Sequence, residues 1–424
     1  MSIQKSLLGL TVLASVGVAA CGGDDATGEF PADCTARISP SSDDQTAVLT
    51  AFNEASDGAK ICFGSGTYHL TGQLDLATPN VTLWGVGMPV LDFEGQTSGA
   101  NGISVVGNGF EANGIWVKNS HGDGIRVTGA TGVTFRNVKV TWDGEPSTDN
   151  GAYALYPVSS TNVLIEDCEI EGASDAGLYV GQSHNIIVRR NVVHGNVAGI
   201  EIENSTIADV YDNEAYDNTA GILVFDLPQL PVHNGGMTRI HNNNMHDNNR
   251  ANFAHEGTIV AGAPQGLGLM TIAGNDVEID NNMIAGNQNA AMLLISYTTV
   301  EEAGLAGSRT SDPEFDPYLE GVFIHDNTMT NNGYEPIGTL GFLVSGVAHP
   351  DAETFPPLED ILFDGWAKPD FTGHQLCIQN SGATFRDFDG EHIFTDMPAV
   401  VMSTDLAPYD CTLPNQAPVV LPQE

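Results

Sequence analysis

The sequence is poor in basic residues. Among its 424 residues, 14 are Lys or Arg and 54 are Asp or Glu, which gives a formal net charge of −40. Nucleic-acid binding needs clustered Lys and Arg to displace counterions from phosphates, so the composition excludes a nucleic-acid partner. The charge also repels polyuronates unless divalent cations bridge them, which makes Ca²⁺ a candidate cofactor. Solubility in salty surroundings, where ions screen charge, is the simpler explanation, and we favour it.

Long apolar runs are also scarce. After residue 21, no segment has the 18 consecutive apolar residues that suggest a membrane-spanning helix. Residues 1–21 are typical of an export signal, with Lys5 before an apolar run from Leu7 to Val18. The signal ends in Val18-Ala19-Ala20-Cys21, which resembles a bacterial lipobox. We therefore expect Cys21 to carry a lipid; cleavage beside an incidental cysteine is the alternative.

The residues after Cys21 bear on where the protein resides. Gly22 and Gly23 follow, with no Asp directly after the cysteine. By analogy with enterobacterial sorting, this favours an outer-membrane lipoprotein of a bacterial cell envelope. Residues 22–33 are expected to be a flexible tether, so that the protein meets the membrane only through its lipid anchor.

Cysteine is rare as well, and five cysteines remain after Cys21. Cys34 and Cys62 bracket the expected N-terminal cap, and Cys377 and Cys411 bracket the C-terminal one. Because exported proteins pass into compartments where disulfides form, we expect each pair to be bonded.

A period of 22 residues is the strongest pattern in the sequence. Tripeptides that begin at Gly177, Gly199 and Gly221 recur at this interval, as do those at Gly102 and Gly124. Such repeats predict a solenoid in which each coil hydrogen-bonds to the next. A helical period is missing, while Val, Ile and Thr alternate with polar residues, so we expect the coils to consist of β-strands.

A second marker consists of an apolar residue, two polar residues and then asparagine. Asn tolerates left-handed backbone at turns, and its amide can bond its copies in adjacent coils, so these residues predict an inward ladder. Cys168 stands at the ladder position one coil earlier and is expected to be a buried thiol rather than a nucleophile. The ladder asparagines are Asn191, Asn213, Asn243, Asn282 and Asn327.

The periodic part predicts one domain at residues 34–413. Apolar residues at helical spacing within 43–60 indicate a short capping helix, which the exposed end of a solenoid needs. The predicted parts are an N-terminal cap at 34–95, coils at 96–350, a C-terminal cap at 351–413 and a loose tail at 414–424.

Uneven ladder spacing locates insertions beside one strand column. Insertions that gather on one face of a rigid scaffold usually form the walls of a binding cleft. The predicted inserts are 142–150, 227–236, 249–266 and 296–320.

The strand column beside these inserts carries the candidate site. Side chains alternate along a strand, so Ile125 should point inward and Arg126 outward. Aligning the coils then places Arg126, Tyr156, Tyr179 and Glu201 in one outward column, which Leu223 and Met270 continue.

We expect these four polar residues to be catalytic. Arg126 could neutralise a substrate carboxylate, a tyrosine could pass a proton, and Glu201 with Glu203 could bind a cation or serve as acid and base. Two carboxylates about 7 Å apart on one strand can raise one pKa. The residues expected to bind substrate are Glu203, Gln182, Asn204 and Asp226.

The column also has a plain structural explanation. Tyr, Glu and Arg are ordinary outward residues of β-solenoids, and stacked tyrosines stabilise sheets. His121, Asp123 and Asp175 lie on turns that lead into these strands and are weaker candidates, since capping turns is the simpler role for the aspartates. The scattered histidines near 246–248 and 325–327 suggest two turns rather than a metal site, and no metal ligand is predicted.

Several segments resemble a known family. Together they are similar to an uncharacterised family of exported, often lipid-anchored, parallel β-helix repeat proteins. The order of elements after the capping helix, with Gly66-Thr67-Tyr68 and Val81-Thr82-Leu83-Trp84-Gly85-Val86-Gly87, also resembles the cap of pectate-lyase-like β-helices. The resemblance implies an all-β fold, a single-stranded right-handed parallel β-helix of that superfamily with a short N-terminal capping helix. The similar segments are 153–157, 174–183, 198–204 and 221–228.

The wider superfamily includes pectate lyases, polygalacturonases and alginate C5-epimerases. Their motifs are missing here: there is no Asp-Pro-His-Glu and no Gly-His-Gly, and Val140-Thr141-Trp142-Asp143 stands in place of Trp-Ile-Asp-His. Fold resemblance alone does not supply a function.

The sequence therefore leaves two classes of function open. One is a monomeric envelope protein that binds or processes a glycan in the cleft, with lyase or C5-epimerase chemistry as its enzymatic form. The other is a non-catalytic surface lipoprotein that binds a partner protein through the same face. Arg126 is the only basic residue in the column, whereas a polyuronate lyase should bring several.

Overall fold

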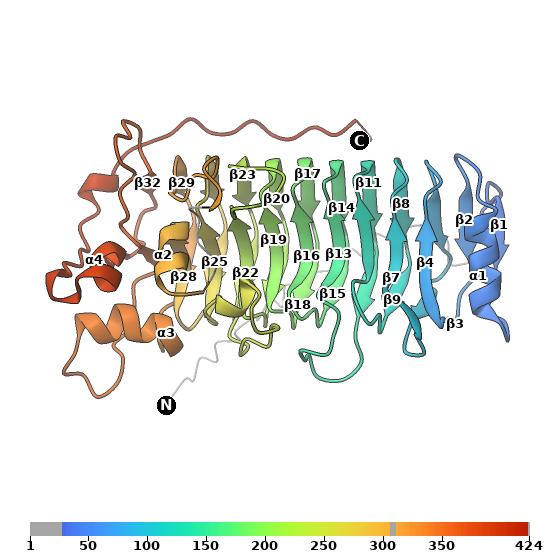
Figure 1. The fold of residues 1–424 in the computed structure, drawn as a ribbon, viewed down its shortest axis with the longest axis horizontal. Helices are drawn as coiled ribbons and strands as arrows, with labels where there is room; N and C mark the ends of the chain where they lie inside the picture. Colours follow the sequence, from blue (N-terminus) through green and yellow to red (C-terminus); the bar gives the residue numbers. More distant parts are fainter. Residues whose placement is uncertain (1–27, 306–310, 423–424) are drawn as a thin grey trace, which may run out of the picture.

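The computed structural model describes residues 28–305 and 311–422. Within them the chain forms a parallel β-helix, seen from the side in Figure 1, whose coils stack along the long axis. Each regular coil contributes one strand to each of three parallel sheets. The export signal, Cys21 and residues 22–27 of the tether lie outside the described residues.

The first sheet contains 12 strands. They are β1 (Ala36–Ile38), β2 (Lys60–Phe63), β5 (Thr82–Gly85), β8 (Phe110–Asn113), β11 (Thr131–Arg136), β14 (Thr161–Glu166), β17 (His184–Arg189), β20 (Thr206–Tyr211), β23 (Gly236–His241), β26 (Val277–Asp280), β29 (Val322–His325) and β32 (Leu376–Gln379).

The second sheet contains 11 strands and carries the predicted site. They are β4 (Gly72–Leu76), β7 (Ser98–Val105), β10 (Ile125–Thr128), β13 (Tyr153–Val158), β16 (Ala176–Gly181), β19 (Ala198–Glu203), β22 (Ala220–Phe225), β25 (Leu267–Ile272), β28 (Ala290–Ile295), β31 (Ile361–Phe363) and β33 (Phe385–Asp387).

The third sheet contains 10 short strands. They are β3 (Thr67–His69), β6 (Val90–Asp92), β9 (Trp116–Lys118), β12 (Lys139–Thr141), β15 (Glu169–Glu171), β18 (Val192–His194), β21 (Glu214–Tyr216), β24 (Asn244–His246), β27 (Met283–Ala285) and β30 (Thr328–Thr330).

The 22-residue period is the length of one coil. Leu178 of β16 lies beside Ile200 of β19, which lies beside Ile222 of β22. All three side chains are fully buried inside the coils, as strand alternation predicts.

The asparagine ladder is confirmed. Asn191 donates from Nδ2 to Oδ1 of Asn213 at 2.9 Å, and Asn213 donates in the same way to Asn243 at 2.9 Å. The backbone N–H of Cys168 donates to Oδ1 of Asn191, so this buried cysteine does occupy the ladder position. The ladder continues through Asn282 and Asn327 to Asn380.

A second ladder runs parallel to the first and is missing from the sequence prediction. Its members stand five residues after their counterparts in the first ladder and are bonded amide to amide in the same way. The two ladders together satisfy buried polar groups at two corners of the coils from Asn191 onward. The second ladder comprises Asn196, Asn218, Asn248, Asn287 and Asn332.

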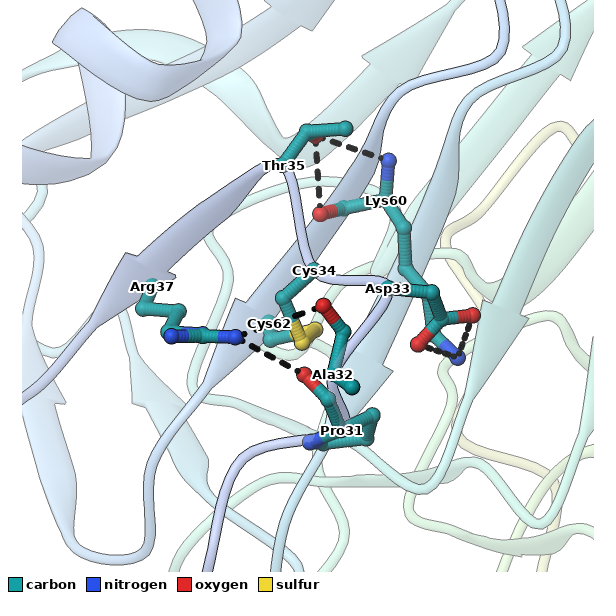
Figure 2. The surroundings of a disulfide bond; sticks show 8 residues. All are labelled: Pro31, Ala32, Asp33, Cys34, Thr35, Arg37, Lys60 and Cys62. Carbon is teal, nitrogen blue, oxygen red and sulfur yellow. Dashed lines mark hydrogen bonds and ion pairs between the residues drawn. A yellow bond between two sulfur atoms is a disulfide. The ribbon is translucent and has the colours of Figure 1, made fainter.

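The N-terminal end is closed by one helix, α1 (Asp44–Asn53), which is shorter than the predicted 43–60. Asp43 caps it by accepting a hydrogen bond from the backbone N–H of Thr46. Figure 2 shows the disulfide between Cys34 and Cys62, which ties the first residues of the cap to β2. The ion pair between Lys60 and Asp33 lies next to it.

At the C-terminal end the structure corrects two predictions. The first is the boundary at residue 350, because β31, β32 and β33 extend the sheets to Asp387. The sequence period is lost in this last coil because helical segments interrupt it. Other helical elements within the described residues are η1 (Val260–Gly262), α2 (Tyr297–Glu302), α3 (Gly338–Leu340), which continues into the π-helix η3 (Gly341–Gly346), α4 (Gly390–Thr395), η4 (Met397–Ala399) and η5 (Ala407–Tyr409).

The second correction concerns residues 414–422, which are not a loose tail. They run back along the first sheet (Figure 1), and the N–H of Val419 donates to Oδ2 of Asp209 at 2.8 Å. Val419 and Leu421 are buried against Leu164 and Ile187. The outward face of the first sheet is apolar at this point, so its burial by the tail is favourable.

The last features of the fold are the second disulfide and the length of the helices. Cys377 and Cys411 form a disulfide that fixes the C-terminal segment to β32 just before the tail begins. No helix among the described residues is long and apolar enough to cross a membrane.

Candidate functional site

The predicted outward column exists in the second sheet. Arg126 of β10 lies beside Tyr156 of β13, and Tyr179 of β16 lies beside Glu201 of β19. The rings of Tyr156 and Tyr179 meet edge to face with their centroids 4.8 Å apart, which joins the two halves of the column. Leu223 continues the column on β22.

The inserts cover this face and bond to one another in pairs. The hydroxyl of Thr148, in the insert at 142–150, donates to the carbonyl of Phe253 in the insert at 249–266. The N–H of Gln229 donates to Asp312 at 2.6 Å and so joins the other two inserts. The side chains beneath are shielded: only 4% of Tyr179 and 3% of Glu201 is exposed.

A third tyrosine, Tyr153, belongs to the site and is missing from the sequence prediction. Its ring centroid lies 4.5 Å from that of Tyr156 and 4.6 Å from that of Tyr179. Alternation along β13 assigns Tyr153 to the inward set together with Leu155. At the first position of the strand, however, its side chain packs with the outward rings, which the period alone does not indicate.

Glu203 is held by two donors. The hydroxyl of Tyr179 donates to Oε1 of Glu203 at 2.6 Å, and Nε2 of Gln182 donates to the same atom at 3.0 Å. Burial raises the pKa of Glu203, and the hydrogen bond from Tyr179 opposes that rise. This oxygen is therefore an acceptor that is kept in place by its neighbours.

Glu201 is the most perturbed carboxyl of the column. Burial raises its pKa well above the ordinary value, and the charge of nearby Glu203 adds to the rise. Its buried Oε2 has no hydrogen-bond partner among the described residues. Since like charges in a desolvated site disfavour each other, burial and mutual repulsion both favour a state in which one carboxyl of the pair Glu201 and Glu203 carries a proton.

The two turn aspartates, weaker candidates in the sequence, also face this network. Burial raises the pKa of Asp175 to about 7, and the charge of Glu203 contributes to the rise. Burial raises the pKa of Asp123 to about 6, against the opposing effect of Arg126. Both carboxyls thus titrate near neutral pH, which side chains that merely cap turns do not require.

Arg126 lies at the open end of the column. Its guanidinium carbon is 4.8 Å from the ring centroid of Tyr156, and one of its nitrogens is 3.8 Å from Oδ2 of Asp123. The Arg126 side chain is 40% exposed, in contrast to the buried carboxyls. Arg126 and the half-buried rings of Tyr156 and Tyr153 therefore form the accessible part of the site.

The family model described as "Right handed beta helix region" matches residues 101–234. Among solved structures, the mannuronan C-5 epimerase AlgE4 A-module of Azotobacter vinelandii is similar over 80% of this chain and 91% of its own, with a TM-score of 0.52 and 14% identity.

The AlgE6 A-module of the same organism, also a mannuronan C-5 epimerase, matches with a TM-score of 0.51 and 17% identity. That match covers 69% of this chain and 84% of the other. This chain therefore has a right-handed β-helix fold. The comparison with curated proteins found no match for this β-helix protein.

Two residues predicted to bind substrate, Asn204 and Asp226, form hydrogen bonds with an insert of the β-helix. Asn204 donates from Nδ2 to the carbonyls of Leu227 and Val232, and its oxygen accepts from the N–H of Leu227. Asp226 accepts from the N–H of Gly235, and burial raises its pKa to about 8. The side-chain amide of Asn204 and Oδ1 of Asp226 are thus engaged within the chain.

Two side-chain clusters among the described residues bear on calcium, a candidate cofactor from the sequence. One cluster, Glu278, Asp280 and His325, brings its ligand atoms within 4.8 Å of one another. Arg239, however, pairs with both carboxylates, and His325 pairs with Glu278. Ca²⁺ needs six to eight oxygen ligands, which this already neutralised group does not offer. In a second cluster, with His374, the cysteines are the disulfide pair.

Proposed function

We propose that this β-helix protein binds a glycan along the outward face of the second sheet and processes it there by acid–base chemistry. The observation that carries the proposal is the stack of Arg126 on Tyr156 at the open end of a buried carboxyl network. Aromatic rings and a guanidinium offer a sugar both apolar contact and hydrogen bonds, the combination that ligand sites use.

The network supports proton transfer near neutral pH. A carboxyl that holds its proton in this range can donate it to a leaving oxygen, and an ionised partner can accept one from water or substrate. Asp123, Asp175, Glu201 and Glu203 all have raised pKa values. The hydroxyl of Tyr179 donates to Glu203, and its ring packs against those of Tyr153 and Tyr156, so the buried carboxyl pair adjoins the accessible part of the site.

The charge balance favours a neutral glycan over a polyuronate. Four carboxyls surround the column, and Arg126 is its only cation. Lyase or C5-epimerase chemistry on a uronate remains the enzymatic alternative, in which Arg126 would neutralise the substrate carboxylate while a tyrosine moves the proton.

A second candidate function is binding without catalysis, to a glycan or to a partner protein. The observation that favours it is the depth of the carboxyls, since Glu201 and Tyr179 lie almost wholly beneath the inserts. In this case Arg126, Tyr153 and Tyr156 form the contact surface, and the carboxyls only hold the tyrosines in position.

We further propose that the protein is an exported, monomeric, lipid-anchored protein of a bacterial cell envelope. Two features support this location: the lipobox-like segment that ends at Cys21, and two disulfides, which are typical of oxidising compartments. Mass spectrometry of Cys21 in the mature protein, together with cell fractionation, tests this part.

The decisive experiment incubates the mature protein with a panel of neutral and uronic polysaccharides, with and without calcium. New reducing ends would reveal hydrolysis, absorbance of unsaturated uronates would reveal a lyase, and proton exchange at C5 by NMR would reveal an epimerase. Calorimetry on the same panel measures binding alone. If no polysaccharide binds or reacts, the proposal is wrong.

Variants separate the two candidate functions. Arg126→Gln should weaken glycan binding at least tenfold, whereas Thr131→Ala, at an exposed position of β11 in the first sheet, should leave it unchanged. Glu201→Gln should abolish catalysis and keep binding. Activity that survives Glu201→Gln would place the chemistry elsewhere.

A further inference from the structure

A cavity of about 300 Å³ lies on the same face of the second sheet, toward the C-terminal end. Its floor consists of outward side chains of β22, β25 and β28, and its walls come from the insert at 249–266 and from α2, η3 and α4. Figure 1 shows these helical elements gathered around that end of the sheet. Segments that do not follow the repeat thus enclose a space over the repeat.

The lining is almost entirely aliphatic and aromatic. The floor residues include Phe225, Met270 and Leu293, and the walls include Val300 and Leu343. Among the lining residues within 28–305 and 311–422, only Gln265, Thr299 and Thr339 have polar side chains, and none is charged. A water molecule is poorly stabilised in such a cavity, because a buried water needs hydrogen bonds to several polar partners.

The cavity continues the rows of the candidate site. Glu203 lies beside Phe225 in the sheet, and Phe225 lies beside Ile272 and then Ile295. One outward row therefore changes from a carboxyl to apolar side chains between adjacent coils, a step of about 4.8 Å. A molecule that lies along this face meets polar groups at one end and an apolar enclosure at the other.

We propose that this cavity binds an unbranched apolar chain of about ten carbons, as an acyl or alkyl group supplies. An apolar cavity of about 150 Å³ accepts benzene, so twice that volume suits a chain of about this length. A charged or sugar group would lose its hydration against these walls without replacement. The inference goes beyond the glycan proposal and does not depend on it, because the apolar lining and the volume alone carry it.

Chain length provides the first test. Calorimetry with hexanoate, octanoate, decanoate and dodecanoate, each below its micellar concentration, should show affinity rising about fourfold per carbon up to about ten and then levelling off. Decyl maltoside, hexyl maltoside and maltose form the second arm. Tighter binding of decanoate identifies a free fatty acid as the better ligand, and tighter binding of decyl maltoside identifies a glycolipid.

Filling the cavity provides the second test. Ala261→Trp on η1 and Ala303→Trp after α2 each place a large ring at the cavity wall from a different segment. Each substitution should weaken the binding of decanoate and of decyl maltoside at least tenfold. Ala251→Trp is the matched control, since Ala251 is exposed in the same insert and does not line the cavity.

Circular dichroism and thermal melting would establish that the three variants fold. Affinity independent of chain length, or wild-type affinity in both folded filling variants, would overturn the inference. A negative polysaccharide panel combined with chain-length-dependent binding would remove the glycan proposal and leave this one standing.

Discussion

The hydroxyl of Tyr179 donates a 2.6 Å hydrogen bond to Oε1 of Glu203, across adjacent coils of the β-helix. The two residues are 24 positions apart in the sequence, and the coil period brings them together. This donor favours the ionised form of Glu203, whereas burial and the charge of Glu203 raise the pKa of Glu201. One bond thus distinguishes the two carboxyls of a buried pair.

Tyr179→Phe removes that donor and keeps the ring. We expect a loss of about 1–3 kcal/mol in the free energy of unfolding at pH 7, because the buried acceptor loses its strongest partner. Urea unfolding followed by circular dichroism measures it. Tyr156→Phe is the control, since its hydroxyl makes no hydrogen bond within residues 28–305 and 311–422, and it should change stability by less than about 0.5 kcal/mol. Equal losses in the two variants would refute the assigned role of this bond.

Asn213→Ala interrupts the first asparagine ladder in the middle. Asn213 accepts from the N–H and Nδ2 of Asn191 and donates to Asn243 and to the carbonyl of Val188, all within the buried interior. Leaving several buried partners unsatisfied should cost about 3 kcal/mol or more. Denaturant unfolding at pH 7 measures the loss.

Asn244→Ala provides the comparison for the ladder variant. Asn244 is half-buried on the outward side of β24, next in sequence to ladder residue Asn243. It should lose no more than about 1 kcal/mol. A ladder variant as stable as this control would mean that the amide stack contributes little to the fold.

The repeating parts of this molecule could be predicted from the sequence because each coil repeats the same physical requirement. Leu178, Ile200 and Ile222 point inward and fill one core, and the ladder amides bond to one another. Both requirements recur in each coil, so apolar residues and asparagines recur in the sequence at the coil period. The outward column of Arg126, Tyr156 and Glu201 followed from the same alternation. The second ladder was open to the same reasoning, five residues after the first.

Two kinds of feature could not be predicted in this way: the direction of side chains on turns, and the contacts made by the inserts. Tyr153 stands at the first position of a strand, and Asp123 and Asp175 lie on turns, where alternation does not fix where a side chain points. The bonds that engage Asn204 come from an insert without a repeat. The tail covers Leu164 and Ile187, outward residues whose apolar character breaks the alternation only locally.

Asp226 should make stability depend on pH. Burial raises its pKa to about 8, whereas an unfolded aspartate titrates near about 4, so the folded protein holds a proton that the unfolded chain has released between these values. This contribution to stability is complete below about pH 4 and falls by about 1.4 kcal/mol per pH unit until about pH 8. Above about pH 8, Asp226 no longer makes the free energy of unfolding depend on pH.

Asp226→Asn keeps an acceptor for Gly235 and does not titrate. Relative to wild type, this variant should therefore gain stability as the pH rises from 4.5 to 9, which urea unfolding at four pH values would measure. Asp212→Asn, at an exposed turn, should follow the wild-type curve. A wild-type pH slope in Asp226→Asn would show that this carboxyl is not the one that titrates.

The disulfide between Cys377 and Cys411 should anchor the C-terminal tail as well as stabilise the fold. The tail begins three residues after Cys411, and its Val419 N–H is protected by Asp209. Replacing both cysteines by alanine should lower the free energy of unfolding by about 3–4 kcal/mol and speed hydrogen exchange at Val419, measured by mass spectrometry of C-terminal peptides.

The matched control replaces Cys34 and Cys62, a pair with a similar sequence separation of 28 against 34. That variant should lose a similar amount of stability and retain slow exchange in the tail under native conditions, because its disulfide lies at the opposite end of the β-helix (Figure 1). Faster tail exchange in both variants would mean that global unfolding, and not the local anchor, governs the tail.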